Sequence, residues 1–341
     1  MSKLTPLGSG IIPTLLSGIY YCIISIRNLW YDTFSQAARK TGRYTVSIGS
    51  IRAGGTGKTP LTLLVGTYFC QMGYETIFLS RGYGRQSSRN TIARPGEKVC
   101  WKEVGDEPAM LHNALTGSWL GIGSKRGGIA ALITKEVKNK AVFILDDGFQ
   151  HRSVHRHKNI VCLSTETLTD TLIPAGYLRE PVSALKRADM ICLIGSHTET
   201  QALKNQQTLL SERLKTEKIV ILYQSADQWV NTKTGRQTQK LPCKNPLLIS
   251  GIARPDRFIN MVRELSVTPY NSVCYEDHHI FESNEISELC TPTTDGIITT
   301  EKDAIRLSTI KLDNCPNIWY LKINLSFIDD KNTNLFFNSL L

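Results

Sequence analysis

Short apolar runs alternate with longer mixed segments along most of the chain. Runs of β-forming or apolar residues, bounded by turn-forming or polar residues, predict strands over residues 44–49, 75–79, 141–145, 159–163 and 190–194. Residues 58–72 and 106–115, which lie between these runs, have the composition and spacing of helices. This alternation predicts an α/β fold, with a mainly parallel sheet and helices on both of its faces.

The second half of the chain repeats the pattern. Strands are predicted over residues 219–223, 247–250, 296–299 and 318–323, and helices over residues 254–265 and 283–289. The polar stretch 231–240 is expected to form a hairpin that turns at Thr234 and Gly235. Because residues 196–211 are polar and rich in Gln and Thr, we divide the chain there, into an N-terminal helical segment (1–40), a first domain (41–200) and a smaller α/β domain (201–341).

The N-terminal segment has no charged residue between Lys3 and Arg27. Its apolar residues recur at intervals of three and four, which predicts one face of an amphipathic helix: Ile12, Leu15, Leu16, Ile19, Ile23, Ile26 and Trp30. Basic residues follow at or beyond its end: Arg27, Arg39, Lys40 and Arg43. Two interpretations stand side by side, a helix lying in a membrane interface and a helix packed on the protein's own core. A membrane-spanning helix is less favoured, because polar and small residues dilute the segment.

Composition narrows the class of protein. In 341 residues, 41% are hydrophobic and 21% are charged, which excludes a mainly disordered, collagen-like or polytopic membrane chain. Forty Lys and Arg residues against thirty Asp and Glu residues give a net charge of +10. This excess suits an anionic partner, such as a nucleotide, a nucleic acid or an acidic membrane surface. The nine cysteines are scattered and include no Cys-x-x-Cys pair, which argues against a disulfide framework or a zinc site.

A glycine-rich turn between the first predicted strand and helix is the strongest single motif. Backbone N–H groups of such a turn can surround phosphates, and the helix that follows adds partial positive charge. We assign ATP binding to Arg52, Ala53, Gly54, Gly55, Thr56, Gly57, Lys58 and Thr59. Lys58 would reach the β- and γ-phosphates, and the Thr59 hydroxyl would bind Mg²⁺. Arg52 stands where the first glycine of the strict pattern belongs, so a glycine-rich turn without a ligand is the alternative.

An acidic pair follows a second buried strand. Four apolar residues, 142–145, lead into Asp146 and Asp147, as in a strand whose terminal carboxylate holds Mg²⁺ directly or through water. Neighbouring carboxylates on an extended chain point to opposite sides, so each of the two is a candidate ligand. The alternative is an acidic turn without a metal.

Five further segments give the pattern a specific family likeness. They are residues 79–85 (LSRGYGR), 104–108 (VGDEP), 146–151 (DDGFQH), 174–181 (PAGYLREP) and 299–303 (TTEKD). Together with the glycine-rich turn, and in this order, they resemble the tetraacyldisaccharide 4′-kinases (lipid A 4′-kinases) over nearly the whole chain. The resemblance implies a P-loop NTPase-like fold that uses ATP and Mg²⁺. It implies transfer of the γ-phosphate to the 4′-hydroxyl of a tetraacyldisaccharide 1-phosphate, the lipid A precursor.

The resemblance also implies roles for single residues and a place of action. Asp106 becomes the candidate base, His278 its support, and Lys58 the catalytic lysine of the loop. The N-terminal helix becomes the element that attaches the protein, peripherally or monotopically, to the cytoplasmic face of the inner membrane. We assign acceptor binding to polar residues of the glycine- and proline-rich motifs: Arg81, Gln150, Arg179 and Glu180. Without the resemblance, Asp106 reads equally well as a solvated helix start, and His278 and the arginines as surface residues.

Two rival functions remain at the level of sequence. A membrane-peripheral P-loop ATPase that acts by partner switching would carry a lysine directly before the glycine pair, where this chain has Ala53. A nucleic-acid-binding ATPase would rest on net charge alone, because no basic run with interleaved aromatic residues occurs. We therefore expect a kinase, with a lipid acceptor and no nucleic-acid partner.

Overall fold

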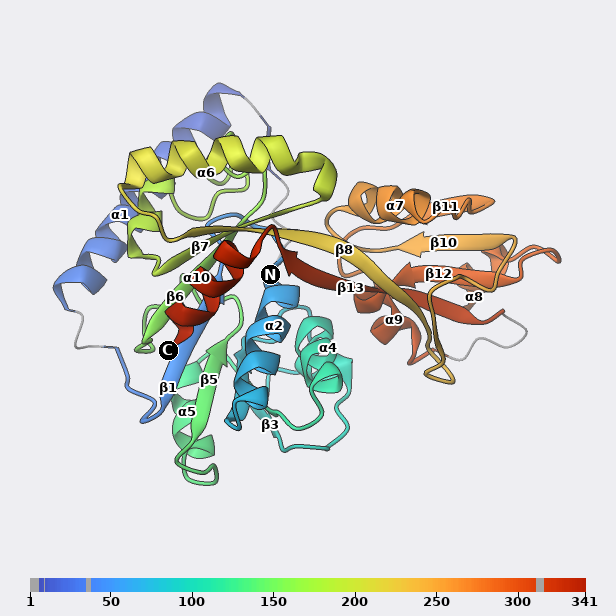
Figure 1. Ribbon diagram of the computed structural model, residues 1–341, viewed down its shortest axis with the longest axis horizontal. Helices are drawn as coiled ribbons and strands as arrows, with labels where there is room; N and C mark the ends of the chain where they lie inside the picture. Colours follow the sequence, from blue (N-terminus) through green and yellow to red (C-terminus); the bar gives the residue numbers. More distant parts are fainter. Residues whose placement is uncertain (1–5, 9, 35–37, 311–315) are drawn as a thin grey trace.

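One sheet runs through the whole molecule in the computed structural model, which describes residues 6–8, 10–34, 38–310 and 316–341 (Figure 1). From the middle outwards, the strands on one side are β8 (Ile219–Asn231), β7 (Met190–Gly195), β6 (Lys158–Leu163), β1 (Tyr44–Gly49), β5 (Ala141–Leu145), β2 (Glu75–Ser80), β4 (Trp119–Ile122) and β3 (Thr91–Ala93). On the other side they are β13 (Ile318–Phe327), β12 (Gly296–Thr300), β10 (Pro246–Ser250) and β11 (Asn271–Cys274), and β9 (Gln237–Thr238) pairs with β8.

Most neighbouring strands are parallel. Within the described residues the antiparallel pairs are β3–β4, β8–β9 and β8–β13. The predicted α/β fold with a mainly parallel sheet is therefore confirmed. In the centre, β1 lies between β5 and β6, and Ser47 is paired with Leu145 and with Asn159. The glycine-rich turn after β1 and the acidic pair after β5 consequently leave the sheet at the same edge, where ligands bind in open α/β sheets.

Helices cover both faces of the sheet, and the molecule has two lobes (Figure 1). On the first lobe, one face carries α2 (Lys58–Gln71), the short α3 (Trp101–Val104), α4 (Asp106–Ala114) and α10 (Asp330–Leu340). Its other face carries α5 (Arg126–Ile133), η2 (Val182–Arg187), η3 (His197–Glu199) and α6 (Thr200–Leu214). The second lobe consists of β9 to β12, α7 (Pro255–Glu264), α8 (Ser283–Leu289) and α9 (Glu301–Leu307), with α7 on the face opposite α8 and α9.

The strands β8 and β13 pass from one lobe to the other. Both strands extend beyond the predicted residues 219–223 and 318–323. The prediction was too short because the later residues do not form apolar runs. In β8 the middle residues are polar and only half-buried where the strand crosses between the lobes. The hairpin is confirmed, since the chain turns at Gly235, with φ of 69°, and β8 pairs with β9.

The polar stretch 196–211, where the sequence was divided into domains, forms η3 and most of α6, and α6 packs Leu203 and Leu210 on the sheet. The division into domains stays a prediction. Parts of two predicted segments lie outside the described residues: residues 1–5, 9 and 35–37 of the N-terminal segment, and residues 311–315 of the smaller α/β domain.

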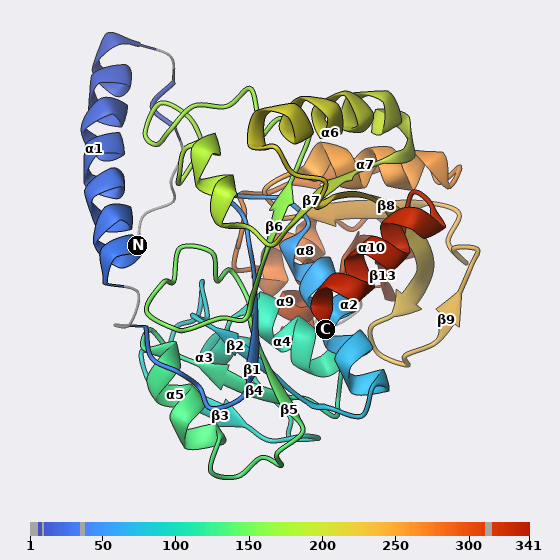
Figure 2. The same ribbon diagram turned by 60° about the vertical axis from the view of Figure 1, so that its left-hand side comes forward.

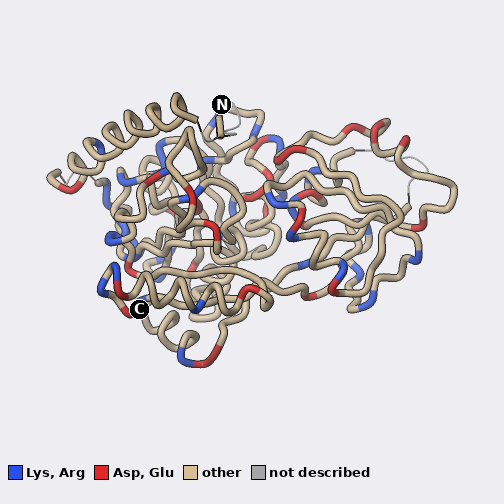
Figure 3. The backbone as a smooth tube through the Cα atoms, turned by 90° about the horizontal axis from the view of Figure 1, so that it is seen from above, with Lys and Arg blue, Asp and Glu red and all other residues tan. Residues whose placement is uncertain are grey.

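The helix α1 (Ile11–Thr33) lies along the outside of the first lobe (Figure 2). The seven residues of its predicted apolar face are 40–73% exposed, so this face does not pack on the protein's own core. Figure 3 shows almost no charge along the tube of this helix. By length and composition alone, it is the one helix among the described residues that could span a membrane.

Candidate active site

The glycine-rich turn joins β1 to α2 and is held in a conformation that requires glycine. Gly54, Gly55 and Gly57 have φ values of 74°, 33° and 80°, in the left-handed region that side chains disfavour. A Cβ atom on Gly57 would also lie 2.9 Å from the side chain of Ile194. Arg52 has a φ outside this region, which explains why the glycine of the strict pattern is not needed there.

The side chain of Arg52 points away from the turn. Its Nε lies 2.7 Å from Asp170 Oδ2, and its guanidinium stacks over the ring of Tyr177 at 4.8 Å. The backbone beside it is braced by the 174–181 motif, since the Ala53 N–H donates to the carbonyl of Tyr177 at 2.9 Å. The Arg52 N–H also donates to Ser50 Oγ, at 3.0 Å. In this arrangement neither Arg52 nor the N–H of Ala53 is free for the predicted contact with ATP.

Asp147 meets the cations of the site. Arg179 Nη1 lies 2.9 and 2.7 Å from its two carboxylate oxygens, and Lys58 Nζ lies 3.8 Å away. Burial raises the pKa of Asp147, but Arg179 and Lys58 outweigh it and hold the pKa below its usual range. Its backbone has a φ of 47°, which is uncommon for a residue other than glycine and often marks a functional turn. Lys58 and Arg179, both predicted site residues, are thus brought together on one carboxylate.

Asp146 is the deeper of the two carboxylates and has weaker partners. Its oxygens lie 3.4 Å from Thr62 Oγ1 and 3.3 Å from Ser80 Oγ, and it is 2% exposed. Burial, followed by the charges of Glu107 and Asp147, raises the pKa of Asp146 to about 7. Arg126 and Lys58 lower this pKa only in part, and Asp146 has no ion-pair partner among the described residues. Such a buried carboxylate, beside a glycine-rich turn, fits a divalent metal ion. Thr59, near the start of α2, has the hydroxyl that such an ion would take as a further ligand.

A second pair of predicted residues meets across the two lobes. Asp106 begins α4 of the first lobe, and His278 lies in the loop after β11 of the second lobe, with His278 Nδ1 2.9 Å from Asp106 Oδ2. The carboxylate of Asp106 is buried, so the alternative of a solvated helix start is wrong. Burial raises its pKa, but Lys302, His278 and Arg306 together hold it below its usual range. Gly84 permits this approach, because its φ is 76° and a Cβ atom there would lie 3.3 Å from His278 Nδ1.

The predicted acceptor residues divide into two kinds. Arg81 is exposed. Burial, followed by the charges of Arg126 and Arg81, lowers the pKa of His151 to about 3, so the surroundings of His151 are positively charged. Glu180 is instead fully buried, and its oxygens accept hydrogen bonds from Asn28 of α1, Gln150 and Arg187. This geometry does not support a direct contact between Glu180 and an acceptor.

Three residues of the site went unassigned in the sequence. Lys302 Nζ lies 3.2 Å from His278 Nε2 and 3.1 Å from Glu107 Oε1. Arg126 is buried and donates to the carbonyl of Asp146 at 2.8 Å, which supports the acidic turn. The signal for Lys302 and Glu107 was present, since both lie in motifs of the family resemblance, but a motif alone does not say which of its side chains face the reaction.

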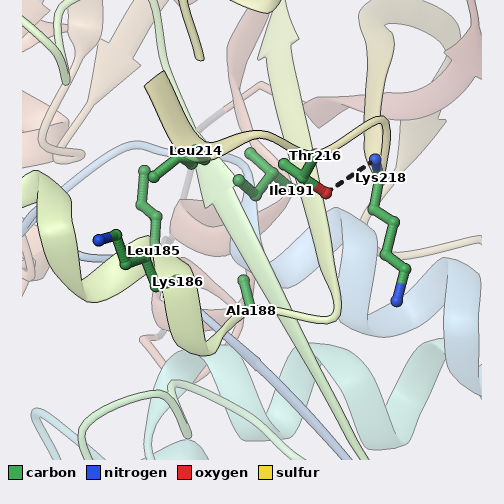
Figure 4. Close-up of a pocket in the computed structure, with 7 residues that line it drawn as sticks. All are labelled: Leu185, Lys186, Ala188, Ile191, Leu214, Thr216 and Lys218. Carbon is green, nitrogen blue, oxygen red and sulfur yellow. Dashed lines mark hydrogen bonds between the residues drawn. The ribbon is translucent and has the colours of Figure 1, made fainter. Parts of the chain in front are cut away.

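A separate hollow of about 290 Å³ lies far from these groups (Figure 4). It is formed around Ile191, at the start of β7, and Leu214, at the end of α6. Since β7 runs parallel to β6 and β6 to β1, this hollow lies at the amino ends of the strands, opposite the glycine-rich turn. It is therefore not part of the candidate active site.

Known proteins share this architecture and this chain length. The family model described as tetraacyldisaccharide-1-P 4′-kinase matches residues 11–341. A tetraacyldisaccharide 4′-kinase of Geobacter metallireducens is 32% identical over 93% of this chain and 94% of its own, and one of Bdellovibrio bacteriovorus is 31% identical over 86% and 88%. The crystal structure of LpxK from Aquifex aeolicus, in complex with ATP, has a TM-score of 0.77 at 27% identity and covers 96% of this chain and 98% of its own. From the family match over nearly its whole length, the chain belongs to the tetraacyldisaccharide-1-P 4′-kinase family.

Proposed function

We propose that Asp106 is the base of this chain's kinase reaction and that the glycine-rich turn with Lys58 holds the phosphates. The reaction is the ATP-dependent phosphorylation of the 4′-hydroxyl of the tetraacyldisaccharide 1-phosphate, a step of lipid A biosynthesis. Such a transfer needs the γ-phosphate and the hydroxyl held in line, with charge stabilisation and a group that accepts the hydroxyl proton. The buried Asp106–His278 pair is the single observation that carries the assignment of the base.

Each residue then has a separate task. Asp106 accepts the proton of the 4′-hydroxyl while His278 fixes the direction of its carboxylate. Lys58 balances the charge that moves on the β- and γ-phosphates. Arg179 holds Asp147 ionised, and the exposed Arg81 is available to an anionic group of the acceptor, such as its 1-phosphate. Glu107 connects the two halves of the site, because its charge acts on Asp146 and its carboxylate contacts Lys302.

Mg²⁺ belongs to this proposal through Asp146, Asp147 and Thr59. Of the two carboxylates, Asp146 is the better ligand, because Asp147 is already satisfied by Arg179. When bound, the ion would neutralise negative charge on the phosphates. Asp146→Asn removes the buried charge, so we expect a loss of activity of about 10²-fold or more together with a melting temperature that rises by a few degrees without Mg²⁺.

Asp147→Asn is the matched variant for that prediction. It breaks the ion pair with Arg179, so we expect its melting temperature to fall. Thermal melts of both variants, with and without Mg²⁺, separate the two residues. A lower melting temperature for Asp146→Asn, with no change in its dependence on Mg²⁺, would contradict the metal assignment.

We also propose that α1 attaches the enzyme to the cytoplasmic face of the inner membrane. The polar side of α1 is fastened to the active-site loops: Tyr20 donates to the carbonyl of Arg179 at 2.9 Å, and Asn28 donates to Glu180 at 2.8 Å. Its apolar side faces outward. A helix that touches the acceptor loops on one side and lipid on the other would hold the site where a lipid acceptor is concentrated.

Replacing Leu16, Ile19 and Ile23 by Ser is expected to release the protein from anionic phospholipid vesicles. Each of these exposed side chains contributes about 1.5–3 kcal/mol at most when buried in lipid. Activity on vesicle-borne acceptor should fall far more than activity on a short-chain soluble acceptor. Leu132→Ser with Leu209→Ser, equally exposed but on α5 and α6, is the control in a vesicle sedimentation assay. A triple variant that still sediments with vesicles would contradict this role of α1.

Turnover of ATP tests the proposed function as a whole. The rate of ADP release by the purified chain should rise when the detergent-solubilised disaccharide lipid is added. It should not respond to double-stranded or single-stranded nucleic acid, and it should need no protein partner. Turnover that is unaffected by the lipid would leave the partner-switching ATPase as the better account.

A further inference from the structure

Lys302 of α9 lies beside the Asp106–His278 pair, at the junction of the two lobes. Its Nζ is 3.2 Å from His278 Nε2, 3.1 Å from Glu107 Oε1 and 3.3 Å from Asp277 Oδ1. The side chain is only 15% exposed. Burial lowers its pKa, but Glu107, Asp106 and Asp277 outweigh it and raise the pKa above its usual range, so Lys302 stays charged. An ammonium group has three hydrogens to donate and no lone pair to offer.

This contact decides which nitrogen of His278 carries the hydrogen. Two charged groups lie near Nε2: the Lys302 ammonium at 3.2 Å, which can only donate, and Asp277 Oδ2 at 3.6 Å, which is beyond hydrogen-bond distance. Nε2 therefore presents its lone pair to Lys302. In a neutral imidazole the hydrogen is then on Nδ1, the atom that lies 2.9 Å from Asp106 Oδ2. We propose that Lys302 is a positioning residue, which fixes His278 as the Nδ1–H tautomer and thereby keeps Asp106 an ionised, oriented proton acceptor. The inference rests on the role of Asp106 as the base.

The other charges around Asp106 do not replace Lys302. Arg306, also on α9, has its Nε 3.6 Å from Asp106 Oδ2, but its terminal nitrogens donate to the carbonyls of Gly251 and His279 and to Asp303. Glu107 of α4 and Asp277 beside His278 are anions, and both contact Lys302. Among the described residues, Lys302 is therefore the cation that contacts the imidazole and also acts on the carboxylate.

The proton balance of the step is simple in this arrangement. As the 4′-oxygen forms its bond to the γ-phosphorus and the bond to the β-phosphate oxygen breaks, the hydroxyl proton passes to Asp106. The Nδ1–H of His278 remains a donor to that carboxylate throughout, and ADP leaves with the electron pair of the broken bond. In this role Lys302 acts on the reaction through the orientation and charge of the pair.

Lys302→Met tests the proposal by its pH profile. We expect kcat to fall about 10- to 100-fold, less than the ~10²–10⁴-fold loss when a base is removed. The acid limb of the profile of kcat/KM should move up by about 1–3 pH units, because a cation near Asp106 is lost. Lys302→Arg should keep the limb at acid pH, and Lys233→Met, an exposed lysine of the same lobe, should match the native enzyme. A fall in kcat with an unmoved limb would mean a merely structural role and overturn the proposal.

A second measurement needs no variant at position 302 and does not depend on activity. In native protein labelled with ¹⁵N-histidine, the signals of His278, identified by their loss in His278→Gln, should show the hydrogen on Nδ1 and a bare Nε2. A hydrogen on Nε2 would overturn the role of Lys302 even if Asp106 is the base. If Asp106→Asn instead keeps its kcat, the base assignment fails while the tautomer measurement stands on its own.

Discussion

Asp106→Asn is expected to lower kcat by about 10²–10⁴-fold and to leave the KM for ATP nearly unchanged. Asparagine has the shape of aspartate and can still accept a hydrogen bond from His278, so the junction of the lobes is retained. It cannot take up the hydroxyl proton. Because the carboxylate contacts His278 and lies near Lys302 and Arg306 rather than the glycine-rich turn, the loss should fall on the chemical step.

Steady-state kinetics against ATP and acceptor measure this effect. Glu288→Gln, which removes an exposed carboxylate from α8, serves as the control for a change of charge in the second lobe. His278→Ala should be milder than Asp106→Asn, since water can partly replace an orienting partner. If Asp106→Asn abolished ATP binding while kcat held, Asp106 would be a ligand of the nucleotide or the metal instead of the base.

Lys58→Met is expected to nearly abolish phosphoryl transfer, by about 10²–10³-fold or more. Its ammonium group has one ion-pair partner among the described residues, Asp147 at 3.8 Å, a long contact that adds little to stability. The melting temperature should therefore change little while activity is lost, which separates catalysis from folding. Lys135→Met, the same change at an exposed lysine beyond α5, is the matched control for both measurements.

The result for Lys58 decides whether the turn is a phosphate site at all. The glycine conformations and the helix start are what such a site requires, but they would also suit a turn without a ligand. Normal turnover by a folded Lys58→Met protein would mean that the lysine does not act on the phosphates.

The local parts of the fold could be predicted from the sequence. The strands β1 and β5 have the predicted bounds, because each is a short run of β-forming or apolar residues that is followed by a turn and is buried on both faces. The glycine-rich turn and the acidic pair could be placed for the same reason: each directly follows a strand, and parallel strands end at a common edge. The apolar face of α1 was also visible in its spacing, although the spacing did not say whether lipid or protein covers it.

What required the structure is the pairing of distant side chains. Asp106 and His278 are 172 positions apart and meet only because β8 and β13 carry the second lobe against α4. The sequence suggested that Glu180 is a loop residue open to an acceptor. In the structure α1 packs over it, and its carboxylate accepts hydrogen bonds from Asn28, Gln150 and Arg187. Burial of a charge depends on such contacts between segments, which no local pattern of residues records.

Transfer of labelled γ-phosphate is the most direct test of the central claim, that this site phosphorylates a disaccharide lipid with Asp106 as its base. Purified chain, γ-labelled ATP with Mg²⁺, and detergent-solubilised tetraacyldisaccharide 1-phosphate would be incubated, and the labelled lipid would be identified by mass and by the position of its new phosphate. We expect label on the 4′-oxygen with the native protein and about 10²–10⁴-fold less of it with Asp106→Asn. Release of labelled inorganic phosphate without labelled lipid, or equal labelling by both proteins, would contradict the account.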